Sequence, residues 1–240
     1  GVSSRVFQYI MRIFAEGDAA LPAHGMGAIP EQLAENIPEG SIRTDARVGS
    51  IHQSKVKLTS GEIITGRVVI LATEGPETAR LLGSKQIPDS RGELCLYYAA
   101  KAPPMKQPYL ILNGDRTGWI NSLTIPSQVA PSYAPPGQAL ISVVVVGHLS
   151  SDDDTIEAAV RGQLSAWFGA PVRDWRHLKT YRIRHALPAQ TPPMPDPTVA
   201  VTPIKPLIFV CGEYGSVPGI QWAMLSGRHA AEAVIKELEQ

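Results

Sequence analysis

The sequence predicts a mixed α/β (α+β) fold in which a parallel sheet is interrupted by a second, largely β-sheet domain. Two runs, 67–72 and 207–211, are almost continuously apolar, which is typical of strands buried on both faces of an α/β sheet. The segment between them is about 135 residues long and rich in strand-forming residues, with one long amphipathic helix expected at 155–168. This order is typical of a nucleotide-binding domain that is interrupted by an inserted domain.

The two expected domains divide the chain unequally. We expect the interrupted domain to comprise residues 1–84 and 200–240, and the inserted domain to comprise residues 85–199. The stretch 188–206 contains seven prolines in nineteen residues. Because proline cannot continue a helix, this composition favours an extended ordered crossing or a linker near the second boundary.

The first expected elements are short helices and strands. Apolar residues at spacings of three and four predict a helix that begins at Ser3 or Ser4 and ends at Gly17. The pair Ser60-Gly61 predicts a hairpin between the strands on either side of it. The other elements expected up to this hairpin are a helix at 31–36 and strands at 41–44, 47–52, 55–59 and 62–65.

The later elements follow from the same criteria. A helix at 76–82 precedes the inserted domain, and a helix at 219–238 follows the last apolar strand. The acids Asp152, Asp153 and Asp154 precede the long helix. Acidic side chains complement a helix N-terminus, so we expect a cap there, with a metal cluster as the alternative. In the inserted domain we expect strands at 94–100, 108–112, 118–123, 139–146 and 177–184.

Composition and charge argue against several classes of function. The chain has 22 Lys and Arg residues against 22 Asp and Glu residues, with no basic run, so it lacks the electrostatic footprint of a nucleic-acid binder. The longest apolar run, 139–146, is far shorter than the roughly 20 residues that a membrane span needs. Serine, cysteine and histidine show no nucleophile-elbow or triad spacing, which argues against hydrolysis.

The two cysteines, Cys95 and Cys211, are too far apart for a C-x-x-C redox or zinc motif, and each lies in an apolar run. We expect buried free thiols in a reducing compartment, with a disulfide as the alternative. The amino terminus has neither a signal-peptide pattern nor an initiator Met. We therefore expect a cytoplasmic protein, or an organellar one, and a chain that was cut from something longer.

The carboxy-terminal segment carries the most informative chemical pattern. Gly212 and Glu213 follow the strand 207–211, which places a carboxylate at the carboxyl edge of the sheet, where open α/β folds bind ligands. A helix that begins near Gly219 directs free N–H groups and a positive dipole end toward that edge. A flavin suits this pattern, because its reduction places negative charge around N1 and the C2 carbonyl, where a helix amino terminus stabilises it.

This segment resembles the carboxy-terminal FAD motif of the flavin-containing amine oxidoreductase superfamily, which includes monoamine oxidases, protoporphyrinogen oxidase and phytoene-desaturase-like enzymes. The blocks 22–33, 42–51, 68–73 and 181–188 resemble further parts of that superfamily in the same order. The resemblance implies a partial FAD-binding, Rossmann-like sheet and a backbone contact between Val48 and the adenine. The cofactor-binding residues that it implies are Val48, Gly212, Glu213, Gly219, Ile220, Gln221 and Ala223.

The chain departs from the superfamily pattern at three places. The G-x-G-x-x-G turn that binds pyrophosphate is missing, since the nearest candidate, 25–30, ends in Pro30 and follows no strand. Glu213 stands where Asp is usual. Trp222 stands where a small residue is usual, and its indole could either crowd the flavin or point into the protein. We therefore expect the carboxy-terminal portion of a longer enzyme, without its G-x-G-x-x-G segment.

The resemblance implies an FAD-dependent oxidoreductase, either amine oxidase-like or desaturase-like. Such an enzyme oxidises a C–H or C–N bond of an apolar or amine-like small molecule by hydride transfer to flavin N5. It needs no catalytic acid or base from these residues and no metal, and the isolated chain is expected to be inactive. The alternative is a non-catalytic binding or interaction module, which would associate with itself or with an upstream segment of the same protein.

Several individual side chains keep two interpretations. Glu213 either contacts the ribityl chain or pyrophosphate, or caps a helix or joins an ion pair. His24 is expected to be exposed in a loop, and His185 is expected in packing or at the surface, with a role in a substrate cavity as the alternative. The aromatic side chains on the strands of the inserted sheet either pack in the core or face a substrate; they are Tyr97, Tyr98, Trp119 and Tyr181.

Overall fold

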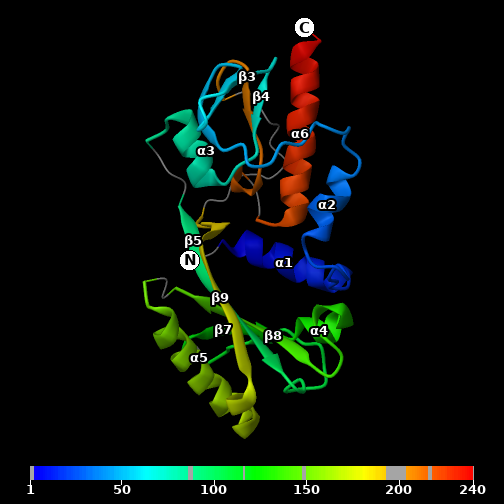
Figure 1. Ribbon diagram of the computed structural model, residues 1–240, viewed down its shortest axis with the longest axis vertical. Coiled ribbons are helices and arrows are strands. Elements are labelled where there is room, and N and C mark those ends of the chain that lie inside the picture. The colour runs from blue at the N-terminus through cyan, green and yellow to red at the C-terminus, as the bar shows by residue number, and fades with distance from the viewer. Residues whose placement is uncertain are drawn as a thin grey trace. The chain divides into compact units, whose positions relative to one another are not determined.

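The computed structural model contains two compact units, each made of segments that are distant in the sequence (Figure 1). The first unit comprises Gly1–Gly17, Gly40–Ser90 and Leu187–Gln240, and the second comprises Asp18–Glu39 and Arg91–Ala186. The structure describes residues 3–85, 89–115, 117–147, 150–192, 204–215 and 218–239. Most of the expected proline-rich crossing, 188–206, lies outside these residues. The division into a cofactor-binding and a substrate-binding domain stays a prediction.

The first unit begins with helix α1 (Ser4–Glu16), which has the expected bounds. Ser3 precedes the helix, but its side chain makes no capping hydrogen bond. The antiparallel sheet that follows has the order β1-β2-β3, and β2 and β3 form the expected hairpin. Its strands are β1 (Val48–His52), β2 (Lys55–Leu58) and β3 (Ile63–Thr65). The register shifts between Val48 and Ser50, so β1 contains a bulge at Gly49.

A parallel pair of strands joins the distant segments of the first unit. Strand β4 (Val69–Leu71) pairs with β10 (Ile208–Val210), as the two apolar runs predicted. Leu71 and Phe209 are buried, but Ile70 is 40% exposed. The expectation that the strand 67–72 is buried on both faces is therefore wrong at Ile70. The described part of this sheet is two strands wide and leaves that side of β4 uncovered.

A helix follows each of these two strands. Helix α3 (Gly75–Leu82) ends at Gly83, whose φ of 66° is the left-handed conformation that favours glycine at a helix end. Strand β10 leads through the short helix η3 (Glu213–Gly215) into α6 (Ile220–Leu238). Ala230 and Val234 are the buried residues of α6. Both helices confirm the predicted ones to within one residue at each end.

The second unit is built around a five-stranded sheet with the order β6-β7-β8-β5-β9. Its central strands pair antiparallel in a continuous register from Glu93 opposite Val146 to Ala100 opposite Ala139. The strands are β5 (Ser90–Ala100), β6 (Ile111–Leu112), β7 (Ile120–Thr124), β8 (Ala139–Val146) and β9 (Arg176–Pro188). The predicted strand at 108–112 is thus reduced to its last two residues, and β5 and β9 are longer than expected.

The main core lies between this sheet and helix α5 (Asp153–Phe168). Alternate residues of a strand point to opposite faces, so Leu94 and Leu96 of β5 share one face with Val143 of β8. The helix buries Ile156 and Val160 at a spacing of four residues. All of these side chains are fully buried and belong to one cluster, which agrees with the strands expected from the apolar residues at 94–100 and 139–146.

Three local expectations need correction. Helix α2 (Ala28–Ala34) begins before the predicted 31–36, because Pro30 is tolerated in its first turn. Residues 41–44 form no strand, and β1 pairs with β2 alone. Two short helices that we did not predict lie in the proline-containing segment after β7, α4 (Pro126–Val129) and η1 (Pro131–Tyr133), and a third, η2 (Ala170–Asp174), follows α5.

Two predictions about single residues are confirmed. Asp152 caps α5, because its Oδ1 accepts a hydrogen bond from the Thr155 backbone N–H at 2.8 Å. Its pKa is lowered chiefly by that backbone hydrogen bond. Cys95 and Cys211 are free and buried. Burial raises the pKa of the Cys211 thiol, which keeps this group protonated at neutral pH.

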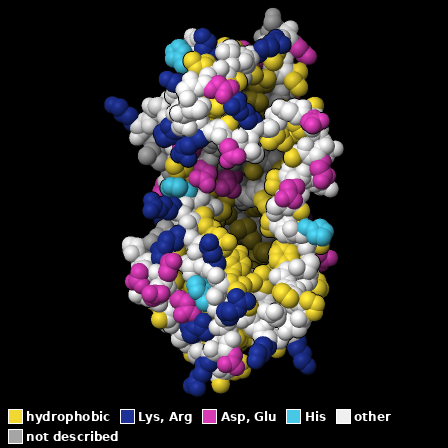
Figure 2. All heavy atoms as spheres, in the orientation of Figure 1, with side chains coloured by type: hydrophobic (Ala, Val, Ile, Leu, Met, Phe, Trp, Pro, Cys, Tyr) yellow, Lys and Arg dark blue, Asp and Glu magenta, His cyan; other side chains and the backbone are white. Residues whose placement is uncertain are grey.

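The surface carries no large area of a single charge on the face that Figure 2 shows, where acidic and basic side chains are mixed. This agrees with the formal net charge of zero. Among the described residues, no helix combines the length and the apolar composition that crossing a bilayer would require.

The valines of β8 provide a matched test of the core. We expect Val143→Ala, at a fully buried position, to lower the free energy of unfolding by about 2 kcal/mol, because it removes buried methyl groups and leaves a cavity. Val146→Ala, on the same strand at a position that is 52% exposed, should change it far less. Denaturant unfolding of both variants measures the difference. Equal losses would contradict the assigned face of β8.

Candidate functional site

The loop between β10 and α6 is held by its own polar groups. The Gly212 N–H donates to Ser226 Oγ at 3.0 Å, which ties the end of β10 to the second turn of α6. Gly212 has a φ of 136°, which side chains of L-residues rarely allow. The Glu213 carboxylate accepts a hydrogen bond from the Gly219 N–H at 3.2 Å. Glu213 therefore helps to hold the loop, and both its cofactor contact and its alternative role stay predictions.

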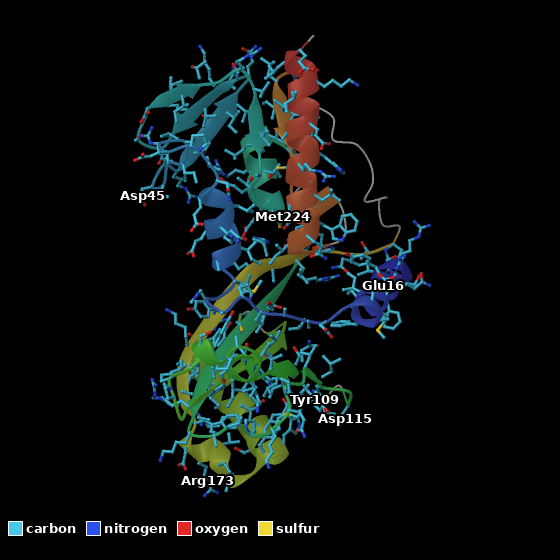
Figure 3. The ribbon with its side chains drawn as sticks, turned by 90° about the vertical axis from the view of Figure 1, so that its right-hand side faces the viewer. Glu16, Asp45, Tyr109, Asp115, Arg173 and Met224 are labelled. Atoms are coloured by element: carbon cyan, nitrogen blue, oxygen red, sulfur yellow. The ribbon has the colours of Figure 1, made fainter. Side chains whose placement is uncertain are left out.

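The first turn of α6 contains backbone hydrogen-bond donors that have no acceptor within the helix. The Trp222 and Ala223 N–H groups both donate to the Gly219 carbonyl oxygen, at 3.1 and 3.0 Å. The N–H groups of Ile220 and Gln221 come earlier in the helix and have no acceptor within it, as at every helix start. Met224 follows in the next turn and is exposed (Figure 3). The start of α6 thus offers two backbone donors and a positive dipole end.

The backbone donors of α6 and the open backbone at Gly212 fit a flavin. Gly219 has φ 153° and ψ 152°, a conformation that is essentially restricted to glycine. Gly212 is restricted in the same way, so the backbone at both ends of the loop carries no side chain. At Gly212 a planar, electron-rich group could approach the backbone closely and accept hydrogen bonds from the α6 N-terminus. At Gly219 the Gln221 amide occupies the corresponding space, since its Oε1 would lie 2.9 Å from an added Cβ.

The Trp222 indole packs against helix α1. Its indole Nε1–H donates to Tyr9 Oη of α1 at 2.6 Å, and the two rings lie 5.7 Å apart at an angle of 55°. The Gln221 Nε2–H group donates to the same oxygen at 3.1 Å. Tyr9 was not singled out by the sequence, because 213 residues separate it from Trp222 and no local motif links them.

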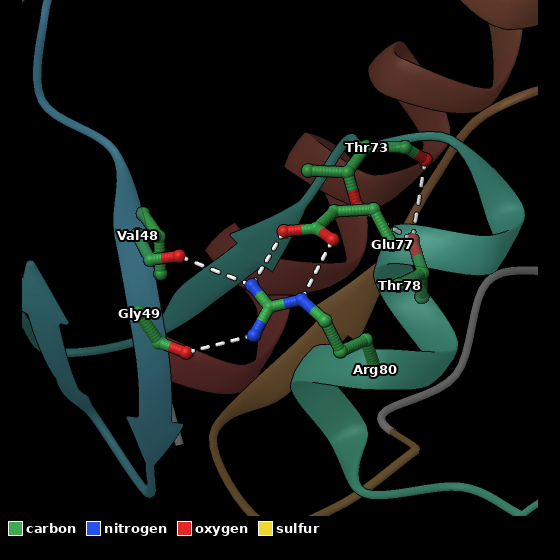
Figure 4. A network of polar contacts seen from close by, with 6 residues as sticks. All are labelled: Val48, Gly49, Thr73, Glu77, Thr78 and Arg80. Atoms are coloured by element: carbon green, nitrogen blue, oxygen red, sulfur yellow. Dashed lines mark hydrogen bonds and ion pairs between the residues drawn. The ribbon is translucent and has the colours of Figure 1, made fainter. Parts of the chain in front are cut away.

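Val48 takes part in a polar network that joins β1 to α3 (Figure 4). The Arg80 guanidinium donates to the Val48 carbonyl oxygen at 3.1 Å and to the Gly49 carbonyl oxygen at 2.9 Å. The same group makes a two-point contact with the Glu77 carboxylate, at 2.7 and 2.6 Å, which lowers the pKa of Glu77. The bulge at Gly49 explains why two successive carbonyl groups are available on one side of the strand.

The carboxyl ends of β4 and β10 lie together, as parallel pairing requires. A Cβ added at Gly212 would have the Thr73 carbonyl oxygen as its nearest neighbour, at 4.0 Å. The Tyr214 ring packs so closely on Gly75 that a side chain at this position would overlap it. Thr73 and Thr78 share a hydrogen bond of 2.7 Å between their hydroxyl groups, which fixes the start of α3 (Figure 4).

The aromatic residues of the inserted sheet divide between its two faces. Tyr98 is fully buried in the core, and Trp119 packs against that core. Tyr97 and Tyr181 meet edge to face on the other side of the sheet, with ring centroids 5.9 Å apart. Near them, Cys95 Sγ lies 3.4 Å from Ser142 Oγ. The core interpretation is therefore right for Tyr98, and the substrate-facing interpretation stays a prediction for Tyr97 and Tyr181.

The two histidines that the sequence singled out are exposed. His24 lies in a shallow surface depression, with Ser132 and Tyr133 on its other side. The hydroxyl groups of Ser132 and Tyr133 donate to the carbonyl oxygens of Ala23 and Pro22, respectively. These two hydrogen bonds hold the loop that carries His24. The expectation of an exposed loop histidine is confirmed for His24.

One family model matches almost the whole chain. The family model described as flavin containing amine oxidoreductase matches residues 3–235. Among solved structures, the chain is similar to a candidate protoporphyrinogen oxidase from Exiguobacterium sp. 255-15, with a TM-score of 0.71 and 18% sequence identity. That alignment covers 91% of this chain and 52% of the other. No curated protein matches the sequence.

Two amine oxidases are also similar in structure. Cyclohexylamine oxidase from Brevibacterium oxydans IH-35A has a TM-score of 0.60 and 17% identity, over 90% of this chain and 53% of that one. A redesigned putrescine oxidase has a TM-score of 0.63 and 10% identity, over 89% of this chain and 53% of that one. At such identities the likeness shows the fold alone. The chain spans about half the length of these structures.

Tyr97 provides a pH test of the inserted sheet. Burial, followed by the interaction with Cys95, raises the pKa of Tyr97 to about 12. An unfolded tyrosine titrates near pH 10, so the stability that the neutral phenol provides is present below pH ~10 and is lost as the pH rises to ~12. We expect Tyr97→Phe to remove this part of the alkaline loss of stability. Tyr109→Phe, at a position that is 61% exposed, should retain it.

Denaturant unfolding across this pH range measures both variants. A Tyr97→Phe variant with the alkaline profile of the Tyr109→Phe variant would contradict the assignment of the raised pKa to Tyr97.

Proposed function

Because this chain belongs to the flavin-containing amine oxidoreductase family, as the match over residues 3–235 shows, we propose that it is the carboxy-terminal part of an FAD-dependent oxidoreductase. The substrate is an apolar or amine-like small molecule. When bound, the flavin supplies the oxidation, in which its N5 accepts a hydride from a C–H bond of the substrate, beside nitrogen where the substrate is an amine. The residues of this chain bind the flavin and the substrate, orient them and exclude water from the site.

The observation that carries this proposal is the start of α6. The N–H groups of Ile220 and Gln221, together with the helix dipole, favour an acceptor that gains negative charge, as the N1 and C2 carbonyl region of a flavin does on reduction. Gly212 leaves the backbone open there, and the Gln221 amide lies beside Gly219. We assign Glu213 to the ribityl or pyrophosphate part of FAD, with its bond to the Gly219 N–H holding it in place. We also assign Ala223 to the flavin contact, because its small side chain leaves room beside the first turn of α6.

Val48 is assigned to the adenine end of FAD. Its carbonyl oxygen accepts a hydrogen bond from Arg80 and has a second lone pair, so the amino group of adenine could donate to the same oxygen. Arg80 would keep its contacts with Val48, Gly49 and Glu77. Adenine binding would thus leave β1 fixed to α3.

Substrate binding is assigned to the inserted unit. The face of its sheet opposite α5 carries Tyr97 and Tyr181, whose edge-to-face pair offers a rigid apolar surface with two hydroxyl groups. This combination suits an apolar or amine-like molecule. No acid or base from this face is needed, because positioning of the C–H bond is the main requirement of hydride transfer.

The visible absorption spectrum tests the proposal. The full-length protein should purify with flavin bands, and this chain alone should not, because the pyrophosphate-binding G-x-G-x-x-G turn is not among its residues. If neither protein shows flavin bands after reconstitution with FAD, the proposed function is wrong. The non-catalytic module would then be the better interpretation.

Gly219 provides the sharper test of the α6 contact. In the full-length protein we expect Gly219→Val to lower the flavin content after purification several-fold, because a β-branched residue cannot adopt this backbone conformation and the helix start must shift. Gly17→Val is the matched control, since Gly17 has an extended backbone and no atom within 4 Å of an added Cβ. An unchanged flavin content in Gly219→Val would exclude the helix start as the flavin contact.

A further inference from the structure

The face of the inserted sheet opposite α5 carries a carboxylate, that of Glu93 in β5. Side chains alternate along a strand, so Glu93 points to the same face as Cys95 and Tyr97. The register between β5 and β8 is continuous here, and it places Glu93 opposite Val146 and Cys95 opposite Val144. The carboxylate therefore lies beside aliphatic and thiol side chains.

Among the described residues, Glu93 has no charged partner. No ion pair or hydrogen bond involves its carboxylate there, and Arg91, two residues earlier in the strand, forms none with it. Burial raises the pKa of the Glu93 carboxyl, and no neighbouring cation offsets this effect. A half-buried negative charge without a partner costs free energy, which a cation that arrives with a ligand would recover.

The polar groups next to Glu93 on this face have partners of their own. Cys95 Sγ lies 3.4 Å from Ser142 Oγ. On the neighbouring strand β9, Lys179 Nζ lies 5.5 Å from the centre of the Tyr181 ring, so a cation already stands over that ring. Because Tyr181 contacts Tyr97, this positive charge lies at the Tyr97 end of the face, and a second cation would be repelled there.

The surface between the two ends is elongated and mostly apolar. Four residues of extended strand separate Glu93 from Tyr97, or about 13 Å between their Cα atoms. Cys95 and Val144 lie between them, and the rings of Tyr97 and Tyr181 stand at the far end. A ligand that lies along β5 would place a cationic end at Glu93 and an apolar body over the thiol and the aromatic rings.

Building on the proposed function, we propose that Glu93 is a specificity-determining residue that binds a positively charged group of the substrate. This group is not the one that is oxidised. A nitrogen that a carboxylate holds as an ammonium keeps its proton, and it lacks the lone pair that assists loss of hydride from the adjacent carbon. The substrate class is therefore an elongated apolar molecule with a cationic group remote from the oxidised C–H bond.

The test measures ligand binding to the full-length protein by isothermal titration calorimetry. The probe is octyltrimethylammonium chloride, which is permanently charged and has no nitrogen lone pair, and octanol is its neutral counterpart. We expect Glu93→Gln to weaken binding of the cation about tenfold, because one charge pair is lost, and to leave binding of octanol unchanged. Glu39→Gln, at an exposed carboxylate of the same unit, is the matched control and should change neither.

Val146→Lys is a second variant that leaves Glu93 in place. It puts an ammonium directly opposite Glu93 on β8, at a position that is 52% exposed. The cross-strand ion pair should neutralise the carboxylate and weaken binding of the cation in the same way. Val146→Gln is its control and should bind the cation as the wild-type protein does. This variant tests the charge of Glu93 even if Glu93→Gln does not fold.

The outcomes separate the two proposals. If Glu93→Gln binds the cation as tightly as the wild-type protein, or loses affinity for both probes equally, this inference is wrong. It is also wrong if the wild-type protein binds neither probe. Absorption spectra of the same samples report the flavin content. Binding that depends on Glu93 in a protein without flavin bands would contradict the proposed function alone, and a flavin-containing protein without such binding would contradict the cation site alone.

Discussion

The parallel pairing of β4 with β10 is the constraint on which the first unit depends. Val69 lies opposite Ile208, so this pairing joins segments that the whole inserted unit separates in sequence. It brings the carboxyl ends of both strands together, and α3 and α6 both start from that edge. This pairing therefore positions the glycines between β10 and α6 and the N–H groups at the start of α6. Without this pairing, Gly212 would have no neighbour at Thr73 and the candidate site would have no fixed edge.

The features that could be predicted from the sequence are those whose signals are local. The apolar runs at β4, β8 and β10 and the acidic cap of α5 each lie within a few residues of the element that they predict. The family resemblance rested on blocks of the same kind, and the family match covers the same span. The glycines at 212 and 219 were marked by their position between a strand and a helix, and their backbone conformations agree with that reading.

The features that could not be predicted depend on partners distant in the chain. Arg80 reaches the backbone of β1 across more than thirty residues, and its target is a pair of carbonyl groups that any sequence possesses. Tyr9 meets Trp222 across almost the entire chain. The sequence shows an unusual Trp222, but nothing in the residues of α1 indicates that Tyr9 is its partner. The prediction that Ile70 is buried was wrong for a related reason. Its burial depends on the number of strands in the sheet, which cannot be read from the sequence of one strand.

The same pairing has a consequence for the order of folding. During synthesis β4 emerges first, and its partner β10 follows only after the whole inserted unit has been made. The strands of the inserted unit pair over shorter sequence separations than β4 and β10 do. The inserted unit can therefore fold while the edge of β4 is still unpaired. The last step is then the docking of β10 and α6 onto segments made much earlier. An error in the inserted unit would delay this closure and prolong the exposure of a short apolar strand.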